Sequence, residues 1–425
     1  MKLPQLSFGL AAGLLTLQLQ AASGDAFLNP ANFTSLGNFN PTMNVLIDLS
    51  SGQMSGGASF TGTDTTQAGT ALVVFTFSSF NLAAGITITF TNGGTGTRAV
   101  ALLSQGDMTI TGTIRGDGQF GTTQPNGGSL VIAKGGPAGG NAVSGMGAGG
   151  NGGTGTLGGG GGGGHGGTGG GGGYTGGGLG GTVYNSDVSA QLLGGSGGGH
   201  GGYSFAALAG LGGGGGGAFQ LGALGSLIIS GTISAEGGGG GAPSSTFGNG
   251  GGGGGGSGGG ILAHAGSVTV NAGAVLSARG GNGGSSRVAN ADVGGGGGGG
   301  GRVHIAYRNS GATNIIINVD GGPGGYGGVG WPNNAGSSGT NGDVGSIVFE
   351  QNVLVPSAVQ APTLTVNRLS GNQLELSWSA NFSTAILESS PALAPIAQWV
   401  PVSSMGNSAL VAIEVGSRFF RLRVP

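Results

Sequence analysis

Eight consecutive glycines run directly into an alternating segment in GGGGGGGGRVHIAY at 294–307. Similar runs occur at 158–164 and 250–256, and 112 of the 425 residues are glycine. Ordering a glycine costs roughly 0.5–1 kcal/mol more than ordering an alanine, whereas a backbone hydrogen bond contributes about 0.5–1.5 kcal/mol net. The two terms nearly balance, so an isolated tract is expected to be a flexible loop. Tracts that pack closely together, as glycine permits at the collagen axis, can be ordered. Both alternatives stay open, and the regular spacing of the flanking segments favours order.

Short alternating segments follow the glycine-rich stretches. They are SLVIAK at 129–134, AFQLGA at 218–223, ILAHAG at 261–266, RVHIAY at 302–307 and SIVFEQ at 346–351. Their second position is always apolar and includes Leu262, and their fourth is apolar except at His264. The last four copies begin 43, 41 and 44 residues apart. A repeat of this length indicates a solenoid or array, and the alternation predicts strands with one buried face.

A second strand is expected in each repeat. The copies are MTITGTIRGDG at 108–118, LIISGTISAEG at 227–237, VTVNAGAVLSARG at 268–280 and NIIINVDGG at 314–322. Each ends in a polar turn closed by glycine, so one unit is read as strand, turn, strand, polar turn and glycine-rich return. Region 140–202 lacks a strand copy and is interpreted as a long excursion.

The sequence therefore predicts an all-β chain. A parallel β-solenoid or β-helix with glycine-rich arms, in a polyglycine II form if ordered, is expected over 108–354. Residues 24–107, which include strand-like 71–77, 86–91 and 98–104, are assigned to an N-terminal cap and lead-in. After a linker at 355–362, six short alternating segments over 363–425 predict a small β-sandwich, with Trp378 and Trp399 as core anchors.

Residues 1–23 have the pattern of a secretory signal peptide. Lys2 precedes an apolar stretch from Leu6 to Leu19, and small residues follow. The stretch is too short for a transmembrane helix, so we expect a secreted or cell-surface protein without a membrane span. The chain has no cysteine, 12 basic and 14 acidic residues, and a net charge of −2. This composition offers no disulfides and no basic patch for nucleic acid.

Two sequence patterns carry a resemblance. The pattern GTISAEGGGGGAP followed by GGGGGGGSGGGILAHAGSVTVNAGAVLSARGGNGG resembles glycine-rich β-solenoid surface and secreted proteins of environmental bacteria. The tail, with QLELSWSA, WVPVSS and RFFRLRV, is similar to the Ig/fibronectin-like modules that end many exported proteins. The resemblance implies a parallel β-helix and an extracellular role, and it carries over no functional residues.

Several motifs have simpler explanations than a binding site. Arg115-Gly116-Asp117 is an RGD tripeptide, but Asp117 aligns with Glu236, Arg279 and Asp320 in a column that changes sign. That column predicts a solvent-facing turn position. His165 and His200 both lie in GGGHGG and are interpreted as loop histidines, because no ligand cluster accompanies them. We expect His264 to be a core histidine and His304 to point outward.

No catalytic, cofactor-binding or metal-binding residue is assigned. GTNGDVGSI at 339–347 is a single copy of a calcium-type nonapeptide, which needs tandem copies. Acidic residues are scattered: Asp107, Asp117, Asp187, Glu236, Asp292, Asp320 and Asp343. Alternating threonines in ITITFT and MTITGT are also typical of ice-binding solenoids. The sequence favours a non-catalytic structural or adhesive protein whose partner is polysaccharide, a cell-surface component or itself. A carbohydrate-binding or carbohydrate-cleaving β-helix and an ice-binding solenoid are the alternatives.

Overall fold

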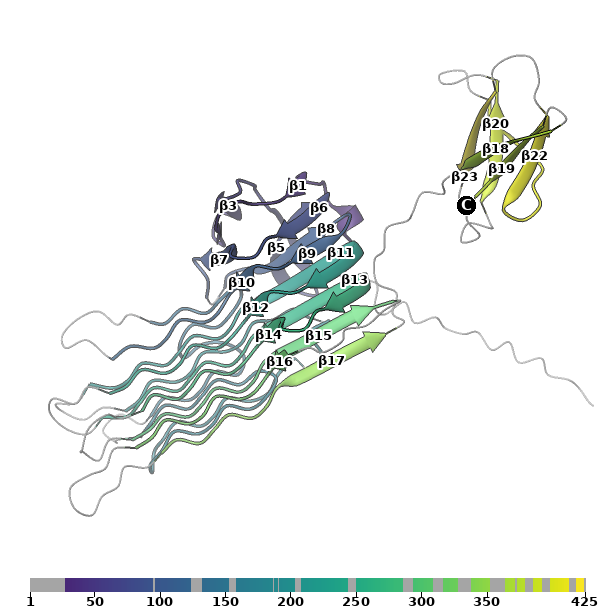
Figure 1. The fold of residues 1–425 in the computed structure, drawn as a ribbon. Coiled ribbons are helices and arrows are strands. Elements are labelled where there is room, and N and C mark those ends of the chain that lie inside the picture. The colour runs from purple at the N-terminus through teal and green to yellow at the C-terminus, as the bar shows by residue number, and fades with distance from the viewer. Residues whose placement is uncertain are drawn as a thin grey trace, which may run out of the picture. The chain divides into compact units, whose positions relative to one another are not determined.

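The computed structural model describes residues 27–94, 96–123, 132–152, 158–185, 187–189, 191–202, 208–243, 250–285, 293–308, 316–327, 338–351, 364–370, 373–378, 385–391, 398–412 and 418–423. The signal-peptide segment, Asp292 and the linker at 355–362 lie outside these residues. The chain divides into two compact units, Met1–Ala358 and Val359–Pro425. The described part is all-β (Figure 1), apart from the short 3₁₀ turn η1 (Pro30–Asn32). None of its helices is long and apolar enough to cross a bilayer.

The larger unit has two mixed sheets. The ten-stranded sheet contains β1 (Asn38–Phe39), β4 (Thr63–Gln67), β5 (Thr70–Phe77), β6 (Ser79–Leu82), β8 (Ala99–Ser104), β9 (Met108–Ile110), β11 (Ala218–Ile229), β13 (Gly260–Val270), β15 (Arg302–Tyr307) and β17 (Ser346–Gln351). The seven-stranded sheet contains β2 (Val45–Asp48), β3 (Gln53–Gly56), β7 (Thr87–Thr91), β10 (Thr113–Arg115), β12 (Thr232–Ser234), β14 (Val275–Ser277) and β16 (Ile316–Asn318). Among the described strands of these two sheets, only the pairs β4–β5 and β2–β3 are antiparallel, and the other neighbouring pairs are parallel.

The main core contains residues from both sheets. Phe219 and Leu221 of β11 belong to one buried cluster with Ile233 of β12 and Ile114 of β10. Alternate residues on the ten-stranded sheet, including Leu262, form a second cluster on its other face. That cluster is completed by Phe27 near the N-terminus and by Val188 and Leu192 from the excursion.

The register corrects the sequence alignment at one copy. Phe219 of β11 pairs with Ile261, not with Leu262, and Ile261 pairs with Val303. The sequence alignment started this copy at Ile261, which is one residue too late. The strand begins at Gly260, which has no side chain and therefore does not show in the alternating pattern. A slip of one residue exchanges the two faces of a strand. Leu262 consequently packs in the second cluster and not in the main core.

The first ladder member also differs from the expected one. Val100 and Leu102 of β8 pair with Phe219 and Leu221, and β5 pairs in parallel with β8 in turn, so strands assigned to the lead-in belong to the repeated ladder. Of the segment 129–134, the residues up to 131 are not described, and Ile132 is 45% exposed and lies in no strand.

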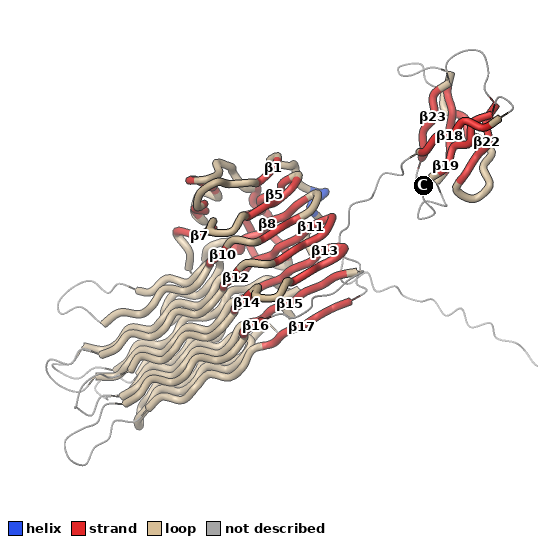
Figure 2. The backbone as a smooth tube through the Cα atoms, viewed as in Figure 1, coloured by secondary structure: helices blue, strands red, loops and turns tan. Residues whose placement is uncertain are grey.

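The glycine tracts form an ordered bundle beside the sheets. Figure 1 shows them running next to one another, and Figure 2 colours them as loops because they form no conventional sheet. In the tract 251–259, Gly251, Gly254 and Ser257 donate to segment 196–202, while the residues after each donate in turn to segments 293–299 and 235–241. The same tract accepts bonds from segments 210–216, 160–163 and 281–284. Each tract residue thus turns by one third of a revolution, and six neighbours surround the tract. The loop alternative is wrong for these residues.

The smaller unit contains two antiparallel three-stranded sheets. One has β18 (Thr365–Leu369), β19 (Gln373–Ser377) and β22 (Ser408–Ala412), and the other β20 (Ile386–Ser390), β21 (Val400–Pro401) and β23 (Phe419–Arg423). They share a cluster that includes Leu376, Leu387 and the buried Trp378. Trp399 is only half-buried, and its ring lies 4.4 Å from the guanidinium carbon of Arg421. The expectation that Trp399 anchors the core is therefore wrong.

Candidate functional site

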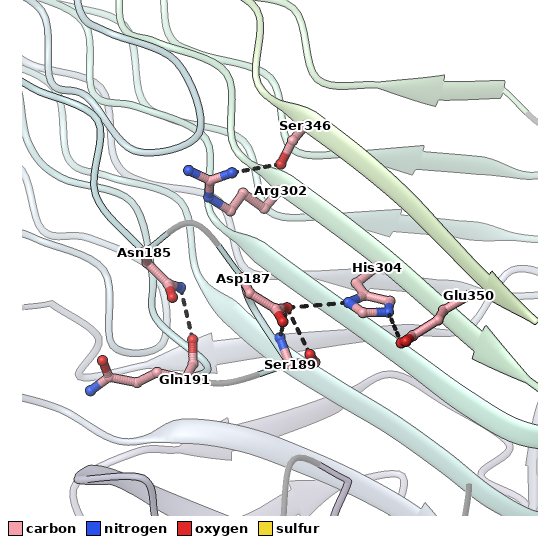
Figure 3. A network of polar contacts seen from close by, with 8 residues as sticks. All are labelled: Asn185, Asp187, Ser189, Gln191, Arg302, His304, Ser346 and Glu350. Carbon is pink, nitrogen blue, oxygen red and sulfur yellow. Dashed lines mark hydrogen bonds and ion pairs between the residues drawn. The ribbon is translucent and has the colours of Figure 1, made fainter. Parts of the chain in front are cut away.

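A polar cluster lies where β15, β17 and the excursion residues 187–189 meet (Figure 3). The register pairs Arg302 with Ser346 and His304 with Val348. Because side chains alternate along a strand, Arg302 and His304 share one face of β15, and Ser346, Val348 and Glu350 share the matching face of β17. The opposite face of β15 carries Val303 and Ile305 into the main core.

Arg302 is a buried cation held by neutral groups. Only 6% of its surface is exposed. Its Nη1 donates to the Ser346 hydroxyl at 2.7 Å, and its Nη2 donates to the Tyr184 carbonyl at 3.1 Å. Within the described part of the chain, no carboxylate lies within ion-pairing distance of it. Burial lowers the pKa of the Arg302 guanidinium, which nearby Tyr184 and Asp187 oppose, but an arginine in a protein keeps its charge.

His304 lies between two carboxylates. Its Nε2 is 3.1 Å from Oε2 of Glu350, and its Nδ1 is 3.4 Å from Oδ1 of Asp187. The His304 side chain is 3% exposed, whereas those of Asp187 and Glu350 are 50% and 45% exposed. A protonated ring donates to both carboxylates, and a neutral ring donates to one. The cluster therefore ties three segments together while leaving both carboxylates in reach of solvent.

Asp187 is fixed by its own turn. Its Oδ1 accepts the backbone N–H of Ser189 at 2.8 Å and the Ser189 hydroxyl at 2.7 Å. Burial alone would raise the pKa of Asp187, but the hydrogen bonds from Ser189 and the influence of His304 outweigh it, so the pKa is lowered. The carboxylate is consequently ionised and pre-oriented at neutral pH.

A cavity of about 310 Å³ opens over this cluster. Its wall is formed by Asp187, Val188, Arg302, Val303, His304, Ser346, Val348 and Glu350. It combines a guanidinium and a hydroxyl at one end of β17, apolar valines in the middle, and carboxylates at the other end. The volume falls within the usual range for small-molecule sites.

A buried polar group continues from Arg302 into the glycine bundle. Nδ1 of His165 donates to the Gly258 carbonyl at 2.9 Å, and its ring stacks on Tyr184 with centroids 4.8 Å apart. Burial lowers the pKa of His165 to about 4 and raises that of Tyr184. His165 is thus a fully buried bundle residue, not a loop histidine. His200 is also within the bundle, where its Nδ1 accepts the amide of Gly212 at 2.9 Å.

The remaining histidines differ from expectation in part. His264 is fully buried, as expected, and its Nε2 lies 3.0 Å from Nε2 of Gln220. His304 does occupy the alternate column, but that column is covered by the excursion and by Phe27, so the expected outward position is wrong. The two charged side chains of the RGD segment form an ion pair with each other, since Nε of Arg115 lies 2.7 Å from Oδ2 of Asp117.

Most of the scattered carboxylates serve the fold. Asp117 accepts the amide of Glu236 at 2.9 Å, and Asp107 accepts the amide of Ser226 at 2.8 Å. Asp343 accepts a hydrogen bond from the Thr168 hydroxyl. Among the described carboxylates singled out in the sequence, Asp187 alone joins the cluster, and Glu350, the second carboxylate beside His304, was missed. The strand pattern could have placed Glu350, because side chains two residues apart on a strand share a face. Glu350 therefore lies on the same face of β17 as Val348 and Ser346.

Threonines form one short outward column. Thr87, Thr113 and Thr232 pair in the seven-stranded sheet, and Val275 and Ile316 continue the column without hydroxyls.

The described residues contain no group of three or more histidine or acidic side chains arranged to hold a metal ion. Comparison with protein-family models, with curated proteins and with solved structures gives no match to this chain.

Proposed function

We propose that this chain is an exported, non-catalytic structural or adhesive protein. In this proposal the parallel ladders form a β-solenoid, the glycine tracts form a polyglycine II bundle attached to it, and the C-terminal unit is an Ig/fibronectin-like β-sandwich. The observation that carries the proposal is the hydrogen bonding of tract 251–259, which reaches six neighbouring segments with a three-residue period.

Such a bundle supports a mechanical or positioning role. Each glycine amide and carbonyl in the tract has a partner. The gain of about 0.5–1.5 kcal/mol per hydrogen bond therefore offsets the extra entropic cost of ordering a glycine, which is roughly 0.5–1 kcal/mol relative to alanine. Eight residues in an extended three-fold helix span about 25 Å, compared with roughly 16 Å for a flexible coil of the same length. A rigid bundle holds whatever lies at its far end at a fixed distance from the sheets.

The proposal is tested with the purified full chain in two assays. Hydrogen exchange should show protected amides in tracts 158–164 and 250–256, since a rigid support requires them. A panel of pectin, alginate, glucan and chitin, with and without calcium, should show binding or self-association without release of reducing ends. Unprotected tracts, or reproducible turnover of any polymer, would refute the structural role.

Carbohydrate binding is the second candidate function. It is favoured by the cavity over Asp187, Arg302, His304 and Glu350, which pairs polar groups at both ends with valines between them.

A further inference from the structure

We infer that the cavity between β15, β17 and residues 187–189 binds an acidic sugar, a hexuronate, through its carboxylate and its hydroxyl groups. The inference rests on the proposed exported, surface-binding role for its biological meaning, but the site itself is argued from the residues alone.

The guanidinium of Arg302 selects an anion. It is buried, its hydrogen bonds go to the hydroxyl of Ser346 and to the backbone carbonyls of Tyr184 and His165, and no described carboxylate lies within ion-pairing distance of it. A buried charge without a charged partner is costly, and a carboxylate in the cavity would supply that partner. A planar guanidinium is also the side chain best suited to a carboxylate.

The other end of the cavity selects hydroxyl groups. The contacts within the cluster use Oδ1 of Asp187 and Oε2 of Glu350, and both side chains are about half exposed. These carboxylates repel a second anionic group but accept hydrogen bonds from hydroxyls. Along β15, His304 and the Asp187 carboxylate beside it lie two residues beyond Arg302, which is about 7 Å in a strand. One sugar ring can therefore present its carboxylate to Arg302 and hydroxyls to Asp187.

The middle of the cavity suits the apolar face of a sugar ring. Val348, which is 41% exposed, lies between Ser346 and Glu350 on this face of β17, and the buried Val188 adds to the wall beside Asp187. A hexuronate has this sequence of groups: a carboxylate, a ring with C–H groups and a set of hydroxyls. Acetate or phosphate would satisfy Arg302 alone, and a neutral hexose would satisfy only the valines and carboxylates.

Calorimetric titration of the full chain with galacturonate, galactose, acetate and phosphate tests the site. We expect galacturonate to bind at least about tenfold more tightly than each of the other three, a difference that corresponds to one good charged contact. Equal affinity for galactose would overturn the inference, since the Arg302 guanidinium would then not contribute to binding. Equal affinity for acetate and phosphate would also overturn it, since the cavity would then bind any small anion.

Variants locate the site. R302Q and V348F should each weaken galacturonate binding about tenfold or more, the first through charge and the second by filling the cavity. Val348 is exposed, so V348F is expected to fold even where R302Q does not. The matched control is V344F, at an exposed valine outside the cavity wall, and it should bind as the unmodified chain does. Unchanged affinity in V348F would overturn the assignment.

Polymer retention separates this inference from the proposed function. Retention of the chain on polygalacturonate, lost in V348F and kept in V344F, supports both. If galacturonate binds and V348F abolishes it, but no polymer retains the chain, the site stands and the adhesive role fails. Retention on pectin that V348F leaves intact would place adhesion elsewhere and overturn this site as its basis.

Discussion

A β-carbon placed on Gly254 would lie 2.0 Å from the carbonyl oxygen of Gly161, a residue 93 positions earlier in the chain. The contact is between two backbones, so neither side can move away without breaking the hydrogen bonds of the bundle. Glycine is therefore required here for close approach and not for turn formation, as it is at the axis of collagen.

The first prediction compares two glycines of the bundle. G254A should lower the melting temperature strongly or prevent folding, because its methyl group overlaps a carbonyl. G171A should be tolerated, since the nearest atom to its added carbon is 3.8 Å away, and it should stabilise the chain by up to about 1 kcal/mol through the unfolded state. Thermal unfolding followed by circular dichroism measures both, and equal melting temperatures would contradict the close packing of the tracts.

The extent to which the sequence predicts this fold is visible in particular residues. The spacing of 41 to 44 residues located β11, β13, β15 and β17, because apolar side chains on one face of each strand repeat with the layers. β8 was placed in the lead-in, because more than a hundred residues separate Ser104 from Ala218, and the strands described between them, β9 and β10, are only three residues long each.

Burial inside the glycine bundle could not be predicted from the sequence. His165 is buried by glycine backbones from distant segments, and glycine has no apolar pattern that could predict burial. The cavity was missed for a related reason. Asp187 reaches His304, and lines one cavity with Arg302, from an excursion more than a hundred residues earlier, and only the three-dimensional stacking of tracts brings it there.

The second prediction concerns the buried face that holds Leu262. L262D should destabilise the larger unit by several kcal/mol, since it removes a fully buried leucine from the second cluster and buries a carboxylate there, beside Gln220 and His304 on the neighbouring strands. N282D replaces an exposed side chain and should change the stability by less than about 0.5 kcal/mol. Urea unfolding of both variants measures the difference, and similar midpoints would be incompatible with the register of β13.

The third prediction is a loss of stability in mild acid that depends on His264. Burial lowers the pKa of His264 to about 3, whereas the unfolded histidine titrates near 6.5. The folded state thus favours the neutral ring. The stability that this preference supplies is fully present above about pH 6.5 and decreases as the pH falls toward the folded pKa. Between pH 7 and pH 4.5 the original chain should lose about 2–3 kcal/mol more than H264Q. Urea midpoints at the two pH values test this, and parallel losses in both proteins would argue against it.

The fourth prediction is that residues 358–425 fold without the rest of the chain. Their two sheets enclose their own apolar cluster, in which Trp378 is 4% exposed. The fragment should melt cooperatively, with a β-type spectrum and blue-shifted tryptophan emission. A random-coil spectrum with fully exposed tryptophans would show that the unit depends on the preceding residues.

The fifth prediction concerns a carboxylate of this smaller unit. Glu388 of β20 receives hydrogen bonds from Arg423 at 2.9 Å and Arg421 at 2.8 Å, both on the neighbouring β23. The bonds from Arg423 and Arg421 lower the pKa of Glu388, so its contribution to stability is present above the pKa of the unfolded carboxyl and disappears as the pH falls through the folded value. E388Q should therefore reduce the melting temperature at pH 7, and the difference from the original chain should narrow near pH 2. E375Q, at a half-buried glutamate of β19 on the other sheet, is the matched control and should have a smaller effect. If E388Q and the original chain keep the same difference at both pH values, the two arginines do not act through the charge of Glu388.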